Sequence, residues 1–391
     1  MTVSHPCRPP VRWQAGSVPV DDNPHINTTR HIDASRVLTP SGWTGPARVV
    51  LGGDGTIATI ESLPDATSAP DIWLVPGFVD LQVNGIDDVD VATAAGTDWD
   101  RLDTLLSAQG VTTWCPTLVT MPLAAYDAPL TRIAAAIGRP EAVRPSIAGV
   151  HLEGPFLGAA PGAHPRRHLV AADPAWIDAL PPHVVLMTVA PEQDGVLDAV
   201  RLLTARGVRV AVGHTRCTEA EFDDAIERGA TLVTHLFNGM SGVHHREPGV
   251  ATFAITSDAF CALIADGVHV DPRVLRLAFS ALGPERAVLV TDAVAWRAGT
   301  VSGIGIELRD GAPRLPDGTL AGSAVTMDAA IRQCVAAGIP LEHALRAASE
   351  NPAAVLGLTD RGRLEPGLRA DVVALTPDLR IAATWVAGRQ A

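Results

Sequence analysis

The central part of the chain alternates between two kinds of segment, which differ in the spacing of their hydrophobic positions. Short apolar runs predict buried strands, and the longer stretches between them have apolar residues at helical spacing. The predicted strands are 72–75 continuing into 78–83, 112–118, 146–152, 184–189, 208–212, 231–234, 261–265 and 287–290. Predicted helices include 99–108, 196–205, 219–228, 272–282, 326–337 and 341–348. Strands alternating with helices in this number are typical of a closed parallel (β/α)8 barrel, the TIM-like fold.

An open, doubly wound parallel sheet is the competing architecture. It would be favoured by a glycine-rich dinucleotide fingerprint directly after the first strand. The segment 76–80 reads Pro-Gly-Phe-Val-Asp and does not have that spacing of glycines. The sequence therefore favours the barrel.

The two ends of the chain share a second pattern, of short β-type runs separated by glycine-rich turns. We expect these runs to pair into one small β-sandwich domain built from both termini. Residues near the N-terminus are rich in Pro, Asp, Asn and His without periodicity, which is typical of a flexible leader. The predicted organisation is a leader at 1–30, a small β domain at 31–75 plus 359–391, and a catalytic barrel at 76–358.

Charge and composition exclude several function classes. The chain has 391 residues with 30 Lys+Arg against 43 Asp+Glu, a net charge of −13, which disfavours binding to nucleic acid or to an anionic membrane surface. None of the cationic side chains is a lysine. A Schiff-base lysine, a Walker-type phosphate lysine and a carboxylated lysine bridging two metals are therefore excluded.

The cysteines and the N-terminal segment indicate the compartment. The five cysteines are widely spaced without a CxxC pair, which argues against a disulfide framework or a structural zinc site. Residues 1–14 lack the apolar region of a signal peptide, and no run is long enough to span a membrane. We expect a cytoplasmic protein.

Polar residues lie where the predicted strands end, which is where a barrel of this kind places its chemistry. Glu153, His214 and His235 follow three different strands. Each one alone has an ordinary explanation, as a loop cap, a hydrogen-bonded core residue or a salt-bridged side chain. Together they offer two imidazoles and a carboxylate, which suit a Zn²⁺ or Fe²⁺ ion with an open position for water. The pattern predicts a metal site.

Three further residues near strand ends have candidate roles beside this site. Asp292 follows the last strand, where a base would take a proton from a metal-activated water, although a turn or cap Asp is the alternative. His164 and His269 lie in loops bordered by glycines and are candidates for hydrogen bonding to a polar substrate. The alternative for each is a surface histidine.

A possible anion site follows the strand that leads to His235. Backbone N–H groups at Asn238 and Gly239 and the guanidinium of Arg246 would suit a phosphate. An ordinary ion pair is the alternative for Arg246. Cys115 has no nearby histidine in the sequence and is interpreted as a core residue.

These motifs as a set resemble the amidohydrolase superfamily and, within it, the N-acetylglucosamine-6-phosphate deacetylase family. The resemblance covers about residues 36–391, and each motif is short, but their number and order are specific. The motifs are PGFVDLQVNG at 76–85, HLEGPF at 151–156, GHT at 213–215, THLFNGM at 234–240, REPG at 246–249, ADGVHV at 265–270 and LVTDA at 289–293.

The resemblance implies a fold and a role for each matching residue. A barrel with a small β domain made from both chain ends is the family's fold. Glu153, His214 and His235 would bind the catalytic metal, and Asp292 would act as the acid and base. His164 and His269 would contact the sugar or its acetamide. The phosphate would be bound by Asn238, Gly239 and Arg246. The family places the arginine that matches Arg246 in the neighbouring subunit's site, which implies a homodimer.

One departure from the wider superfamily bears on the number of metals. Many amidohydrolases have His-x-His on the first strand and bind two ions, whereas this chain has Gln82 and Asn84 there. Amides are poor ligands for a second borderline ion, so we predict one divalent metal ion, with Zn²⁺ as the expected ion and Fe²⁺ as the alternative.

Trp296 and Arg297 are bulky for the loop after Asp292, which leaves the identity of the sugar substrate open.

The expected reaction is hydrolysis of the acetamide of N-acetyl-D-glucosamine 6-phosphate. Other small amides are alternatives within the same class: N-acetylgalactosamine 6-phosphate, a cyclic amide or an N-acyl amino acid. A catalytically inactive barrel used as a binding subunit is the alternative from another class. The presence of the full set of candidate catalytic residues disfavours that last alternative.

Overall fold

The computed structural model describes residues 30–64, 69–140 and 142–391. Eight parallel strands form a barrel, and the first, β7 (Phe78–Val83), pairs with the second, β10 (Val111–Val119). The remaining barrel strands pair in chain order: β12 (Val150–Glu153), β13 (Val184–Val189), β14 (Arg209–Val212), β15 (Ala230–Val233), β16 (Phe260–Leu263) and β17 (Ala287–Leu289). The predicted barrel is confirmed.

The barrel closes between its first and last strands just beyond the regular pairing. A parallel bridge joins Val83 to Ala293, and the backbone N–H groups of Asn84 and Gly85 donate to the Ala293 carbonyl at 2.8 and 3.1 Å. The carboxyl ends of all eight strands therefore face one common opening, where candidate site residues from distant segments can meet.

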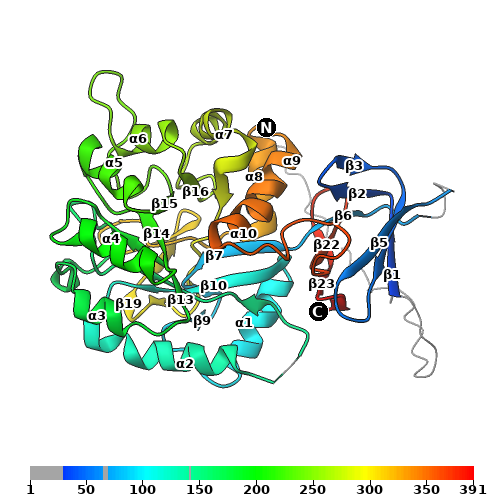
Figure 1. Ribbon diagram of the computed structural model, residues 1–391, viewed down its shortest axis with the longest axis horizontal. Helices are drawn as coiled ribbons and strands as arrows, with labels where there is room; N and C mark the ends of the chain where they lie inside the picture. Colours follow the sequence, from blue (N-terminus) through cyan, green and yellow to red (C-terminus); the bar gives the residue numbers. More distant parts are fainter. Residues whose placement is uncertain (1–29, 65–68, 141) are drawn as a thin grey trace, which may run out of the picture.

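Helices cover the outside of the barrel (Figure 1). In α4 (Val196–Ala205) the buried residues Val196, Ala199, Val200 and Leu203 follow the i, i+3, i+4, i+7 spacing of one apolar face. The other α-helices are α1 (Asp98–Ser107), α2 (Asp127–Ile137), α3 (Pro174–Ala179), α5 (Glu219–Glu227), α6 (Val250–Thr256), α7 (Pro272–Arg286), α8 (Met327–Ala336), α9 (Leu341–Ala348) and α10 (Glu350–Leu356).

Two small sheets beside the barrel combine segments from both ends of the chain (Figure 1). One contains β1 (Arg30–Ala34), β4 (Ala47–Leu51) and β5 (Ile57–Ser62). The other has the order β24-β23-β22-β6-β2-β3, with β2 (Arg36–Thr39), β3 (Gly42–Thr44), β6 (Trp73–Pro76), β22 (Val372–Leu375), β23 (Ile381–Val386) and β24 (Arg389–Gln390). Buried residues of both sheets, among them Val49, Ile57, Leu74 and Val372, form one apolar core.

One detail of the strand prediction was wrong. The run at 72–75 does not continue as a barrel strand, because Gly77 separates it from β7. It is β6 of the second small sheet, where it pairs with β2 in parallel. The leader predicted at 1–30 lies outside the described residues except for Arg30, which begins β1.

A pair of hairpins between β17 and α8 was not predicted. It consists of β18 (Thr300–Val301) with β19 (Ile304–Gly305), and β20 (Glu307–Arg309) with β21 (Ala312–Arg314). The other short strands are β8 (Gly85–Ile86), which pairs with β9 (Val89–Asp90), and β11 (Ser146–Ile147), which pairs with β10.

Within the described ranges, no helix has the length and apolar character that crossing a bilayer requires.

Candidate metal centre and active site

The candidate metal ligands lie at the ends of three barrel strands. Glu153 is the last residue of β12, and His214 and His235 each lie two residues beyond the end of β14 and β15. His214 has φ of 51° and His235 has φ of 26°, and Asp292, beyond β17, has φ of 48°. Non-glycine residues rarely adopt positive φ, and such residues are concentrated at functional sites. The chain turns sharply at each of these positions, just beyond the end of a barrel strand.

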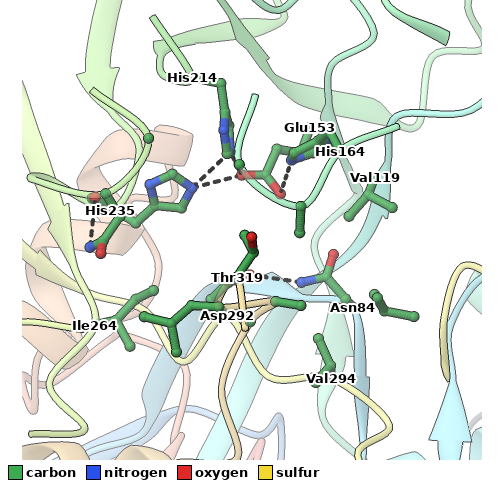
Figure 2. Close-up of a pocket in the computed structure, with 18 of the residues that line it drawn as sticks. Asn84, Val119, Glu153, His164, His214, His235, Ile264, Asp292, Val294 and Thr319 are labelled. Carbon is green, nitrogen blue, oxygen red and sulfur yellow. Dashed lines mark hydrogen bonds and ion pairs between the residues drawn. The ribbon is translucent and has the colours of Figure 1, made fainter. Parts of the chain in front are cut away.

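The structure brings Glu153, His214 and His235 into direct contact (Figure 2). The Oε1 atom of Glu153 lies 3.1 Å from Nε2 of His214 and 2.9 Å from Nε2 of His235. The two Nε2 atoms are 3.1 Å apart, and the three residues are between 3 and 6% exposed. Although burial opposes it, hydrogen bonds from the two histidines hold the pKa of Glu153 well below its usual range.

The orientation of His214 fits a metal ligand. Its Nδ1 lies 3.1 Å from the carbonyl oxygen of Ala160, an acceptor, so Nδ1 carries a proton and Nε2 is the nitrogen left to bind a metal. This Nε2 faces the Glu153 carboxylate and His235. Separations near 3 Å between neighbouring ligand atoms suit bonds of roughly 2.0–2.2 Å to a shared Zn²⁺. The donor set therefore fits a divalent cation.

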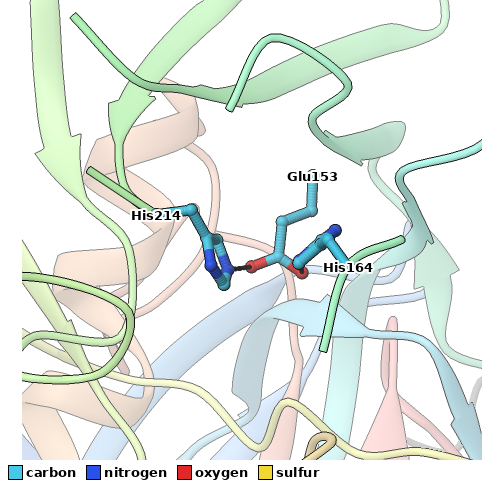
Figure 3. A group of neighbouring side chains, drawn as sticks. All are labelled: Glu153, His164 and His214. Carbon is cyan, nitrogen blue, oxygen red and sulfur yellow. Dashed lines mark hydrogen bonds and ion pairs between the residues drawn. The ribbon is translucent and has the colours of Figure 1, made fainter. Parts of the chain in front are cut away.

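His164 is a fourth polar group at this centre (Figure 3). Its Nε2 lies 3.6 Å from Oε2 of Glu153, and ligand atoms of His164, Glu153 and His214 all lie within 4.8 Å of one another. Nδ1 of His164 is held by Thr120, through the backbone N–H at 3.3 Å and the hydroxyl oxygen at 2.9 Å. Burial lowers the pKa of His164 to about 3, which keeps the ring neutral. Since Thr120 holds Nδ1, Nε2 is the nitrogen that faces the Glu153 carboxylate.

Asp292 is held by the two amides at the end of β7. Its Oδ1 accepts hydrogen bonds from Nδ2 of Asn84 at 2.8 Å and from Nε2 of Gln82 at 3.1 Å. The same Gln82 nitrogen lies 3.0 Å from Oε1 of Glu153, so one amide group donates to both carboxylates. Burial, with the nearby Glu153 charge, raises the pKa of Asp292 to about 8. Two amide side chains thus hold the carboxylate of Asp292 in place.

Asp80 is a site residue that the sequence analysis missed. Its Oδ1 accepts the backbone N–H groups of Gln82 and Thr291, each at 3.2 Å, and its Oδ2 accepts the Thr291 hydroxyl at 2.6 Å. These bonds join the first strand to the segment after the last strand, next to Gln82 and Asp292. The available signal was the carboxylate of Asp80 within the predicted strand 78–83, two residues before Gln82.

A cavity of about 300 Å³ opens on these groups (Figure 2). Predicted site residues that line it are Asn84, Glu153, His164, His214, His235, Asn238, Gly239, His269 and Asp292. Gly239 has φ of 59°, and a Cβ there would lie 2.8 Å from Nδ1 of His214, so a larger residue would displace that imidazole. The hairpins that were not predicted contribute an apolar wall through Val301 and Ile304.

Two predicted substrate residues differ in their relation to the cavity. His269 lines it, and its Nδ1 lies 2.6 Å from Oδ2 of Asp266, which fixes the orientation of the ring. Arg246 is exposed, its Nη1 lies 2.8 Å from Nε2 of His245, and it is not among the described lining residues. A single chain therefore does not bring Arg246 to the cavity.

Comparisons with known proteins place the chain among hydrolases of similar fold. The amidohydrolase family profile matches residues 73–391. An N-acetylgalactosamine-6-phosphate deacetylase from Escherichia coli O157:H7 is 37% identical over 380 residues, which are 93% of this chain and 99% of that protein. An N-acetylglucosamine-6-phosphate deacetylase from Bos taurus is 39% identical over 346 residues, 81% of this chain and 82% of the relative.

A solved structure has the same fold over almost the whole chain. It is a mutant N-acetyl-D-glucosamine-6-phosphate deacetylase from Mycobacterium smegmatis in complex with N-acetyl-D-glucosamine-6-phosphate. It aligns with a TM-score of 0.86 at 33% identity, covering 93% of this chain and 99% of that one. The chain therefore belongs to the amidohydrolase family, in the group that contains the N-acetylglucosamine-6-phosphate deacetylases.

Proposed function

We propose that the chain hydrolyses the acetamide of N-acetyl-D-glucosamine 6-phosphate to D-glucosamine 6-phosphate and acetate. The observation that carries the proposal is the meeting of Glu153, His214 and His235 at the cavity that Asp292 also lines. The deacetylase names of relatives that match more than four-fifths of the chain support the same reaction.

In this proposal Glu153, His214 and His235 hold one divalent ion, Zn²⁺ first and Fe²⁺ as the alternative. When bound, such an ion would lower the pKa of a water molecule well below its value in bulk solvent, which would make that water a better nucleophile at neutral pH. Gln82 and Asn84 hold no second ion, because their amide nitrogens donate to Glu153 and Asp292.

In this proposal Asp292 transfers protons during the reaction, and His164 stabilises the negative charge that develops on the substrate. Asp292 takes a proton from the attacking water and later delivers it to the leaving amine of the sugar. The Nε2–H of His164 donates to the oxygen of the amide as that oxygen becomes negative. No covalent bond between enzyme and substrate is needed, because water itself is the nucleophile.

The phosphate of the substrate is proposed to bind at Asn238 and Gly239, with Arg246 supplied by the partner subunit of a homodimer. The exposed position of Arg246 and its absence from the described cavity lining of its own chain support this division between subunits. A cytoplasmic location is part of the proposal, and it is consistent with four buried free cysteines among the described residues.

Replacing Arg246 by Ala is expected to raise KM for the phosphorylated sugar by roughly 10–100-fold, because a charge-assisted bond to phosphate is lost. Hydrolysis of unphosphorylated N-acetylglucosamine should stay nearly unchanged. Steady-state kinetics on both sugars measure the difference. The matched control is Arg273→Ala, which removes an arginine that is 91% exposed on α7. Equal losses on both sugars would exclude a phosphate role for Arg246.

Purified protein is expected to release acetate from N-acetylglucosamine 6-phosphate, and a chelator should abolish the release. Adding back Zn²⁺ or Fe²⁺ should restore it, and the more effective ion identifies the metal. An enzyme-coupled acetate assay before chelation, after chelation and after reconstitution gives the result. Activity that persists after the metal has been removed completely would refute the proposed mechanism.

N-acetylgalactosamine 6-phosphate is the second candidate substrate. The Escherichia coli O157:H7 relative, which matches 93% of this chain, has this specificity in its name. The two sugars differ only in the configuration at C4, so the metal centre acts on the same acetamide in both. The same acetate assay with equal concentrations of the two sugars decides between them through kcat/KM.

A further inference from the structure

The loop after β13 has a carboxylate, Glu192, to which the proposed reaction gives no role. Glu192 is not among the described residues that line the active-site cavity. Strands β12, β13 and β14 are neighbours in the barrel, so the loops that follow them lie side by side at its carboxyl end. The partly buried side chain of Glu192 contacts both neighbouring loops.

Both carboxylate oxygens of Glu192 accept hydrogen bonds from these loops. Its Oε1 accepts the backbone N–H of Ala159, after β12, at 3.1 Å and that of Arg216, after β14, at 2.8 Å. Its Oε2 accepts the hydroxyl of Thr215. That hydroxyl oxygen in turn accepts the backbone N–H of Cys217 at 3.0 Å. One side chain therefore joins three loops that are separate in the sequence.

The segment after β12 that Glu192 holds also contacts His214. The backbone N–H of Gly158 donates to the carbonyl of His214 at 3.0 Å, and Nδ1 of His214 donates to the carbonyl of Ala160 at 3.1 Å. The N–H that Glu192 binds belongs to Ala159, between these two residues. A Cβ on Gly158 would lie 2.0 Å from Oε1 of Glu192, so a larger residue there would displace the carboxylate. The contact of Glu192 thus lies within the segment that orients the His214 ring.

The backbone at His214 also depends on neighbouring contacts. Its φ of 51° lies in a region that non-glycine residues rarely adopt, and such a conformation persists only where the surroundings fix it. Glu192 binds the two residues that directly follow, through the Thr215 hydroxyl and the Arg216 N–H. The same carboxylate therefore stabilises the turn at His214 and the segment that orients its ring.

We propose that Glu192 is a positioning residue for the metal centre and that it acts through His214 on the affinity for the divalent ion. Groups that orient a metal-binding imidazole through its other nitrogen typically contribute a factor of roughly 10–100 in metal affinity. Without Glu192, the Ala160 carbonyl and the turn at His214 lose their common anchor. This inference rests on the proposed function, because it takes His214 to be a metal ligand.

The Zn²⁺ affinity of the protein after chelation, measured by competition with a chelating indicator, tests the proposal. Glu192→Ala is expected to raise the Kd for Zn²⁺ by roughly 10–100-fold. Glu192→Gln keeps an oxygen for the N–H groups of Ala159 and Arg216, so it should recover most of that loss. The control is Asp194→Ala, which removes an exposed carboxylate from the same loop and should leave the Kd unchanged.

A second measurement separates positioning from a general loss of stability. The visible absorption spectrum of the Co²⁺-loaded protein reports the arrangement of the metal ligands, and it should change in Glu192→Ala but not in Asp194→Ala. Thermal melts of the metal-free proteins show whether each variant is folded. If Glu192→Ala is not, Thr215→Val replaces it, because this substitution removes one contact of Glu192 and keeps the carboxylate. The Kd for Zn²⁺ should then rise in the same direction.

The outcomes distinguish this inference from the proposed function. If the unmodified protein binds Zn²⁺ and Glu192→Ala binds it equally well, the inference alone is overturned. An equal rise in Kd for Glu192→Ala and Glu192→Gln would also overturn it, because charge rather than hydrogen bonding would then set the affinity. Absence of Zn²⁺ binding in the unmodified protein would refute the proposed metal centre and this inference with it.

Discussion

Replacing Glu153 by Gln is expected to remove most of the bound metal and to lower kcat/KM by at least about 10³-fold. Gln has nearly the same shape but lacks the negative charge that balances a divalent ion between His214 and His235. In the proposed mechanism the ion would contribute several kcal/mol of transition-state stabilisation, and each 1.36 kcal/mol corresponds to roughly a tenfold change in rate. Elemental analysis of the purified variant measures the metal, and acetate release measures the rate.

The control for this variant is Glu307→Gln, at a side chain that is 74% exposed on β20. It makes the same chemical change away from the cavity and should retain full metal and activity. A thermal melt shows whether the Glu153 variant is folded. If that variant is folded and still binds one metal per chain, Glu153 is not a ligand and the proposed centre is wrong.

Replacing Asp292 by Asn is expected to lower kcat by roughly 10²–10⁴-fold while the metal stays bound. An Asn carbonyl oxygen at this position can still accept the hydrogen bonds that Gln82 and Asn84 now donate to Asp292. The substitution therefore keeps the local geometry and removes only the capacity to take up and deliver a proton. Metal content and KM should change much less than kcat.

Asp258→Asn, at an exposed residue near β16, is the matched control and should behave as the parent. The ratio of kcat between the two variants at equal metal content measures the contribution of Asp292. Unchanged turnover in Asp292→Asn would remove this residue from the mechanism. A parallel loss of metal and rate would instead assign Asp292 to metal binding.

The strand and helix pattern could be predicted because each element has its own local periodicity. The helices at 196–205 and 341–348 match α4 and α9 at both ends. The run at 72–75 was joined to the barrel strand at 78–83 because an apolar strand has the same pattern in a barrel and in a neighbouring sheet. Its partners, β2 and β22, lie far away in the sequence, and local pattern gives no information about such pairing.

Candidate ligands could also be predicted, since polar residues directly after apolar strands are conspicuous. The roles of Asp80 and Thr120 could not, because each depends on hydrogen bonds to a residue from a distant strand or loop. The imidazole of His164 is held by Thr120, which lies 44 positions earlier in the chain. Nothing in the sequence near His164 determines that contact.

By itself, the sequence determined the barrel, the residue types available for chemistry and the absence of lysine-based mechanisms. These conclusions follow from composition and from short-range periodicity, and both can be read directly from the amino-acid sequence. Only the tertiary structure decided that Glu153, His214 and His235 are in contact, that amides hold Asp292, and that Arg246 lies away from its own chain's cavity. The reason is physical: these relations join segments that meet only when the barrel closes, and distances of about 3 Å depend on the packing of every strand between them.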